Sequence, residues 1–129
     1  MGMGEPDETV PGPNQAGDDF VAPGGFPMPE HLAPQDLGHL LGSSLVSLAA
    51  FAEITAKGEV PDAQIAGNAR TAKSEILRTV DYLLGRYGAD IDAVQGLREF
   101  LVQFRLEVAQ YRWEEAVQTY RRAKQDFHF

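Results

Sequence analysis

The stretch "LREFLVQFRLEVAQYRWEEAVQTYRRAKQDF", residues 97–127, decides the fold. It contains neither proline nor glycine, and its apolar side chains recur at spacings of three and four residues. That spacing is typical of a helix with an apolar face. We expect a helix from about residue 92 to residue 127, with Asp92 as its N-cap and Gln95 as the capping-box partner. At about 1.5 Å per residue this helix would be roughly 50 Å long.

Two apolar registers, displaced from each other by one residue, run along this expected helix. The first consists of Val94, Leu97, Leu101, Phe104, Val108 and Tyr111. The second consists of Val102, Leu106, Ala109, Trp113, Ala116, Tyr120, Ala123 and Phe127. The first register ends at Tyr111, because Glu115 and Gln118 occupy its next positions, whereas the second continues to the end of the helix. We expect the first register to pack inside a bundle and the second to need a cover of its own.

The cover of the second register is left open by the sequence. Trp113, Tyr120 and Phe127 would each forfeit about 1.5–3 kcal/mol if they stayed exposed, so something should bury them. A second copy of the chain, another protein, the N-terminal segment folded back, or a sufficiently long first helix would each serve. The small residues Ala116 and Ala123 between the rings would let another helix approach closely.

Two further helices precede this stretch. The first is expected over residues 34–56, because leucines recur at helical spacing after Pro34 and Lys57-Gly58 forms a good C-terminal signal. The second is expected over residues 62–87, with Gly88 after its end. The predicted fold is all-α: an antiparallel three-helix bundle over residues 34–129, with a long last helix and a preceding segment of residues 1–33.

The N-terminal segment is acidic and rich in proline and glycine. Residues 1–36 hold seven of the 19 acidic residues and none of the 11 lysines and arginines, in a chain of formal net charge −8. Such a composition predicts an extended or disordered tail. The apolar residues Phe20, Val21 and Phe26 also fit a short docking segment that lies on its own domain or on a partner.

Catalytic and metal-binding chemistry finds little support. The chain has no cysteine, and its histidines, His31, His39 and His128, do not have metal-ligand spacing. The paired carboxylates Asp18-Asp19 and Glu114-Glu115 are better explained as solvated surface groups. We therefore expect neither an enzyme nor a bound cofactor or metal.

Basic and aromatic residues near the C-terminus raise the question of nucleic acid. Arg105, Arg112, Arg121, Arg122 and Lys124 are offset there by Glu107, Glu114, Glu115 and Asp126. The local field is therefore weak, and nucleic-acid binding is a minor alternative. Arg121 and Arg122 fit an acidic protein segment better, and they also complement the dipole at a helix C-terminus.

The middle of the chain, about residues 44–112, resembles a family of short bacterial all-helical proteins of unknown function. The matching pieces are "SLVSLAAFAE" (residues 44–53), "AK" (residues 72–73), "VDYLL" (residues 80–84) and the neighbourhood that ends at Tyr111. The resemblance implies a helical bundle and supplies no activity.

The functional hypothesis is a non-enzymatic protein–protein interaction module, an adaptor or small structural subunit. It would self-associate or join a larger assembly through its last helix. The expected contact residues are Trp113, Ala116, Tyr120, Ala123, Phe127, Arg121 and Arg122, with Phe20, Val21 and Phe26 as a second contact. The alternative is a bundle that binds a ligand or cofactor in an apolar pocket lined by Phe51, Tyr87, Phe100 and Phe104. No signal peptide or membrane span is expected, so the default location is cytoplasmic.

Overall fold

The first two long helices begin and end at capping groups that lie next to them in the sequence. The computed structural model describes residues 20–129. Helix α2 (Pro34–Ala56) has proline in its first turn, and the Asp36 carboxylate accepts a hydrogen bond from the Ala33 N–H at 2.9 Å. After α2 the chain turns at Gly58, whose φ of 75° is left-handed. Helix α3 (Ala63–Arg86) is capped by the Asp62 carboxylate, which accepts from the Ile65 N–H at 2.8 Å. Both predicted ranges agree with these bounds to within a residue.

The predicted third helix is wrong in its extent, because residues 92–127 do not form one helix. A short helix α4 (Gly88–Asp92) follows α3, and two longer helices follow it, α5 (Leu97–Ala109) and α6 (Trp113–Phe127). Asp92 is therefore the end of α4 and not an N-cap. Its carboxylate instead binds the Arg98 guanidinium at 2.6 and 3.0 Å, which lowers the pKa of Asp92. Helix α5 begins after Gly96, whose φ is 85°.

The break between α5 and α6 occurs without glycine or proline. Tyr111 adopts a left-handed φ of 61°, its N–H bonds the carbonyl of Val108, and the Arg112 N–H bonds the carbonyl of Glu107 at 2.8 Å. This pair of hydrogen bonds is the Schellman ending of a helix, with tyrosine where glycine is usual. The left-handed tyrosine costs about 1–2 kcal/mol. The turn lets Trp113 and Tyr120 be buried, and each contributes about 1.5–3 kcal/mol, so the broken chain is favoured.

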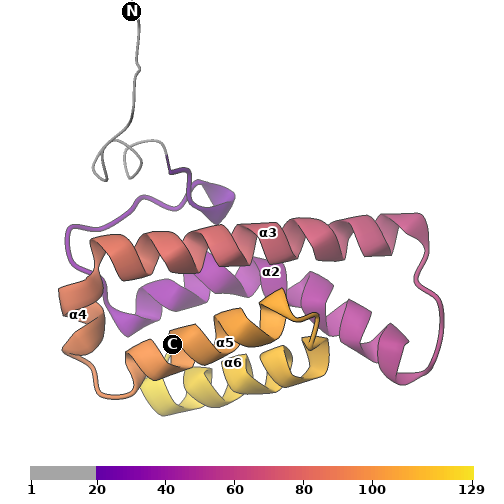
Figure 1. Ribbon diagram of the computed structural model, residues 1–129. Helices are drawn as coiled ribbons and strands as arrows, with labels where there is room; N and C mark the ends of the chain where they lie inside the picture. Colours follow the sequence, from indigo (N-terminus) through magenta and orange to yellow (C-terminus); the bar gives the residue numbers. More distant parts are fainter. Residues whose placement is uncertain (1–19) are drawn as a thin grey trace, which may run out of the picture.

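The four long helices form an antiparallel bundle in which each contacts two neighbours. Helix α2 packs on α3 and α6, and α5 packs on α3 and α6. Figure 1 shows α5 and α6 side by side below α2 and α3, with α2 and α3 extending further at one end. The all-α fold is confirmed for the residues that the structure describes, and the bundle has four long helices where three were expected.

The core fills the space between these four helices. Its largest fully buried side chains are Phe104, Leu37, Leu40, Leu41, Leu48, Ile76, Leu83, Ile91, Leu97, Leu101, Val80 and Val108. One carboxylate is buried with them: Glu107 accepts hydrogen bonds from Thr119 at 2.6 Å and from Gln103 at 2.8 Å. Because Thr119 lies on α6 and Glu107 on α5, this polar contact fixes the two helices relative to each other.

Helix α2 is unusually apolar for a helix of this length. Of the helices in residues 20–129, it is the one that by length and composition could cross a membrane, with a mean hydropathy of 1.4 over its most apolar window. About a third of that window is buried in the bundle, against α3 and α6. One helix of this kind is weak evidence of a membrane span, because the core helix of a soluble protein passes the same test of length and composition.

Candidate interaction surface

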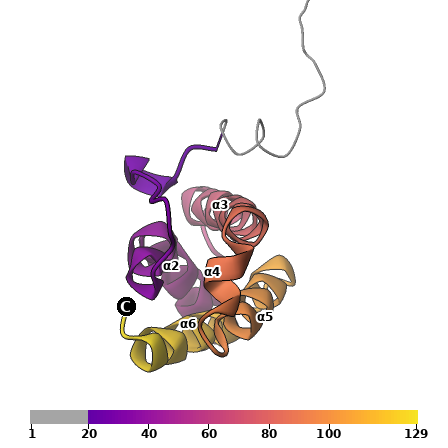
Figure 2. The ribbon, with the colours of Figure 1, turned by 90° about the vertical axis from the view of Figure 1, so that its left-hand side faces the viewer.

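An extended segment, residues 20–33, lies across the outside of the bundle before α2 begins. We call it the strap. Seen along the bundle axis, it lies over α2 with α3 beside it (Figure 2). Ala22 and Leu32 are buried, Phe20, Phe26 and Met28 are partly buried against the core, and Val21 is 76 % exposed. The strap is therefore seated on the helices, with Val21 facing away from them.

A tight turn in the strap directs two rings toward the bundle. The turn is the short 3-10 helix η1 (Pro23–Gly25), in which Gly24 and Gly25 have φ values of 68° and 71°. These left-handed values favour glycine. A Cβ at either position would meet nothing within 4 Å, so the requirement is conformational and not steric. Phe20 and Phe26 lie on either side of this turn, and both face the helices.

Each of the two phenylalanine rings stacks on a ring of the bundle. Phe20 stacks on Tyr82 of α3, with centroids 4.1 Å apart and planes 7° apart. Phe26 stacks on His39 of α2, with centroids 4.9 Å apart and planes 10° apart. Stacked aromatic pairs contribute about 0.5–1.5 kcal/mol beyond the area that they bury. We call the four residues His39, Tyr82, Tyr87 and Asp90 the strap-binding face.

The second half of the strap is held by hydrogen bonds. The Tyr87 hydroxyl donates to the carbonyl of Pro29, and the Leu32 N–H donates to the Asp90 carboxylate at 2.9 Å. Burial raises the pKa of Tyr87, and the nearby Arg86 guanidinium opposes that shift. The phenol therefore stays protonated, and can donate this bond, across the ordinary pH range.

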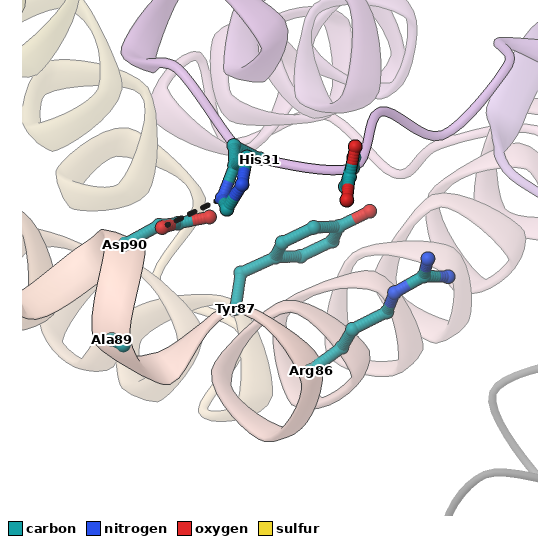
Figure 3. Close-up of a pocket in the computed structure, with 6 residues that line it drawn as sticks. His31, Arg86, Tyr87, Ala89 and Asp90 are labelled. Carbon is teal, nitrogen blue, oxygen red and sulfur yellow. Dashed lines mark ion pairs between the residues drawn. The ribbon is translucent and has the colours of Figure 1, made fainter.

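A small polar pocket lies where this half of the strap meets the end of α3. It has a volume of about 210 Å³ and is lined by Glu30, His31, Arg86, Tyr87, Ala89 and Asp90. The Nδ1 atom of His31 lies 3.5 Å from the Asp90 carboxylate (dashed in Figure 3), and the Tyr87 ring lies between this pair and Arg86. Within residues 20–129, no three histidine or acidic side chains are gathered as metal ligands. The pocket shares Tyr87 and Asp90 with the hydrogen bonds that hold the second half of the strap.

The last-helix residues expected at a partner interface are inside the molecule. Trp113 is 4 % exposed and Tyr120 3 %, and Ala116 and Ala123 are buried between them. Trp113 meets the edge of Phe51 from α2, with centroids 5.1 Å apart. The cover that these side chains require is therefore supplied by α2 and α5 of the same chain, through the turn at Tyr111.

The remaining predicted residues are spread over different places. Phe127 is partly buried, and its ring centroid lies 6.2 Å from that of Phe100. Arg121 and Arg122 lie on the exposed side of α6. Of the cations considered for nucleic acid, Arg105 pairs with Asp81 and Arg112 with Glu115. Asp18 and Asp19 lie outside the described residues.

The residues proposed for an apolar ligand pocket are not brought together. Phe104 is fully buried and stacks with Phe100 in the core, at a centroid distance of 5.7 Å. Phe51 lies against Trp113, and Tyr87 is under the strap. Phe100 and Phe104 are therefore neighbours, whereas Phe51 and Tyr87 pack on other groups, and the polar pocket described above has only Tyr87 of these four in its lining.

Sequence reasoning placed Phe20 and Phe26 in a docking segment but missed the residues that receive them. Tyr82 and His39 lie outside the apolar stripes of their helices, and a ring at a surface position of a helix was the available signal. Tyr87 and Asp90 are 58 residues from the strap atoms that they bind. No local pattern reports a contact over that separation.

Comparison with known proteins returned no match for this chain among family models, curated proteins or solved structures.

Proposed function

We propose that the chain is a non-enzymatic protein–protein interaction module, an adaptor or small structural subunit, that binds its partner through the strap-binding face. The observation that carries this proposal is the strap itself, an extended polypeptide segment that two helices hold by aromatic stacking. Extended and proline-rich segments are recognised by surfaces of this kind, on which aromatic side chains are displayed. The strap thus supports an extended, proline-rich segment as the kind of ligand that the face binds.

In this proposal the last helix, α6, supports the recognition face, whereas its aromatic residues suggested from the sequence that it would bind the partner directly. Its rings hold α6 on α2 and α5, so they shape the bundle that supports Tyr82 and His39. A rigid support favours recognition because little conformational freedom is lost on binding. The module consists of a closed helical bundle and a separate recognition face on its outside.

The test is affinity purification from the native source with three versions of the full chain. They are the wild type, Tyr82→Ala, and Tyr111→Ala as the matched control, since Tyr111 is an exposed tyrosine of the α5–α6 turn. A partner recovered with the wild type and the control, and lost with Tyr82→Ala, supports the proposal. Equal recovery with all three versions would contradict it.

A further inference from the structure

We propose that the natural occupant of the part of the strap-binding face formed by Tyr82 and His39 is an extended acidic segment of a partner protein that resembles residues 20–28 of the strap. Such a segment would carry two aromatic residues six positions apart with a Pro-Gly-Gly turn between them, as Phe20 and Phe26 do. The strap then acts as an intramolecular competitor that this segment displaces. The inference rests on the proposed function and adds the chemistry of the partner and the way in which access is controlled.

The two halves of the strap are held in different ways. Residues 29–33 are tied to the helices by the hydrogen bonds of Tyr87 and Asp90. Residues 20–28 form no hydrogen bond with the bundle; their backbone bonds, from Gly25 to Ala22 and from Phe26 to Pro23, stay within the turn. The first half can therefore leave the surface without leaving a buried polar group unpaired. The second half keeps the strap attached and serves as its hinge.

The contacts made by the first half are those that another segment could make equally well. They are two stacked rings, the buried methyl of Ala22 and the partly buried Met28. Stacking and methyl burial depend on the residue types and on their spacing, not on the connection to α2. A partner segment with the same spacing would meet Tyr82 and His39 in the same way.

The charge around Tyr82 favours an acidic occupant. Arg78 and Arg86 lie one helical turn before and after it on α3, and the Arg86 guanidinium donates a hydrogen bond to the Tyr82 hydroxyl. Arg78 is exposed and has no ion-pair partner among the described residues. In the chain's own sequence, two aspartates directly precede the first aromatic of the strap pattern. Acidic residues at the same place in a partner would lie within the field of these cations.

The experiment measures peptide binding to full-length chains by fluorescence anisotropy. The probe is a labelled peptide with the sequence AGDDFVAPGGFPMP, which is that of residues 16–29. The receptor is the full chain with Phe20→Ser and Phe26→Ser, which frees the face, beside the wild type, in which the strap competes. Because a competing conformation lowers apparent affinity by the fraction of accessible sites, we expect the opened chain to bind at least about tenfold more tightly than the wild type.

Matched variants establish where the peptide binds and why. In the opened chain, Tyr82→Ala should abolish binding and Tyr111→Ala should leave it unchanged. A peptide with both aspartates replaced by asparagine should bind more weakly, and its binding should depend less on salt. Circular dichroism of each receptor checks that the bundle is intact. If the double variant does not fold, Phe20→Ser alone takes its place, since it removes one ring.

Several results would overturn the inference. Equal affinity for wild-type and opened chains would show that the strap does not compete, and a folded opened chain without peptide binding would show that the strap is a fixed part of the fold. Dimerisation of the wild type that Tyr82→Ala prevents would assign the face to a second copy of the chain. The proposed function is tested separately, by the affinity purification. A partner captured through Tyr82, together with no peptide binding, would support the proposed function and overturn the inference about the partner's chemistry.

Discussion

Tyr111 is the residue whose backbone determines the course of the second half of the chain. Its left-handed conformation places its ring beside Trp113, with centroids 5.5 Å apart, and under the Lys73 ammonium, which lies 3.9 Å from the ring centroid. These contacts hold a side chain that remains 57 % exposed. They also explain how tyrosine can stand at a position where glycine would be unstrained.

We predict that Tyr111→Gly is more stable than Tyr111→Ala by about 1 kcal/mol, because both lose the ring and only glycine relieves the left-handed strain. Urea denaturation of the two variants measures the difference. The same pair at Gln110, where φ is −95°, should show the reverse order, since glycine there adds only chain entropy in the unfolded state. The same order at both positions would contradict the assignment of strain to Tyr111.

Tyr87 makes the attachment of the strap sensitive to alkaline pH. Its pKa is raised above the ordinary value of 10.0 by burial, so the folded state holds the proton more tightly than the unfolded chain does. The stabilisation is therefore complete below about pH 10 and is lost as the pH rises through the folded-state pKa. Above that pH the phenolate cannot donate to the Pro29 carbonyl, and the strap should loosen.

Hydrogen exchange of the strap amides, measured from pH 8 to pH 11 and corrected for intrinsic rates, tests this prediction. Protection of the amides of residues 30–33 should fall above about pH 10 in the wild type, and Pro29 has no amide proton to report. In Tyr87→Phe, protection should be low at every pH, because the hydroxyl is missing. A wild type whose protection stays constant over this range would exclude control by Tyr87.

At the scale of elements, a helix boundary is predictable from the sequence when the residues that cause it lie within one turn of it. A boundary that depends on contacts between distant residues is not. Helices α2 and α3 were predicted because Pro34, Gly58 and Asp62 act on residues within one turn. The division between α5 and α6 was missed because no glycine or proline marks it. Its signal was present in another form: the first apolar register ends at Tyr111, where the chain turns.

Of the candidate site, the sequence predicts the aromatic residues of the strap but not the helix residues on which they stack. Phe20 and Phe26 stand out as apolar residues in a proline- and glycine-rich acidic segment. Their receptors could not be inferred, because stacking on Tyr82 and His39 depends on how α2 and α3 are placed relative to each other. Likewise, Trp113 was assigned to an interface because its burial inside the chain requires a turn that a continuous helix would not make.

Replacement of residues 110–112 by three alanines should restore one long helix across the α5–α6 turn. The variant would release α6 from α2 and leave Trp113 and Tyr120 without their cover. Exchange of α6 between two chains would bury them again, so we predict dimers or larger species. Light scattering at several protein concentrations measures this, with a Gln110→Ala single variant as the control. A monodisperse monomer with wild-type stability would show that the turn does not depend on these three residues.

For the whole molecule, the bundle should owe its stability to the α6 aromatic residues. We predict that Trp113→Ala lowers the free energy of unfolding by about 3–5 kcal/mol, as expected for truncation of a large core side chain. Tyr111→Ala, which removes an exposed ring next to it, should cost much less. Urea denaturation measures both changes. If Trp113→Ala left the stability unchanged and abolished an oligomer, Trp113 would be an interface residue, as the sequence suggests, and not a core residue.

The packing of α2 against α6 joins the first long helix of the chain to the last. During synthesis α2 leaves the ribosome well before its cover exists, since Trp113 follows Ala56 by 57 residues, or about 3–11 s at ordinary translation rates. For that interval an apolar helix of 23 residues has only α3 to shield it, because its other long neighbour is α6. The nascent chain should therefore be a substrate for chaperones that bind apolar segments, and it should stop being one once α6 has been made.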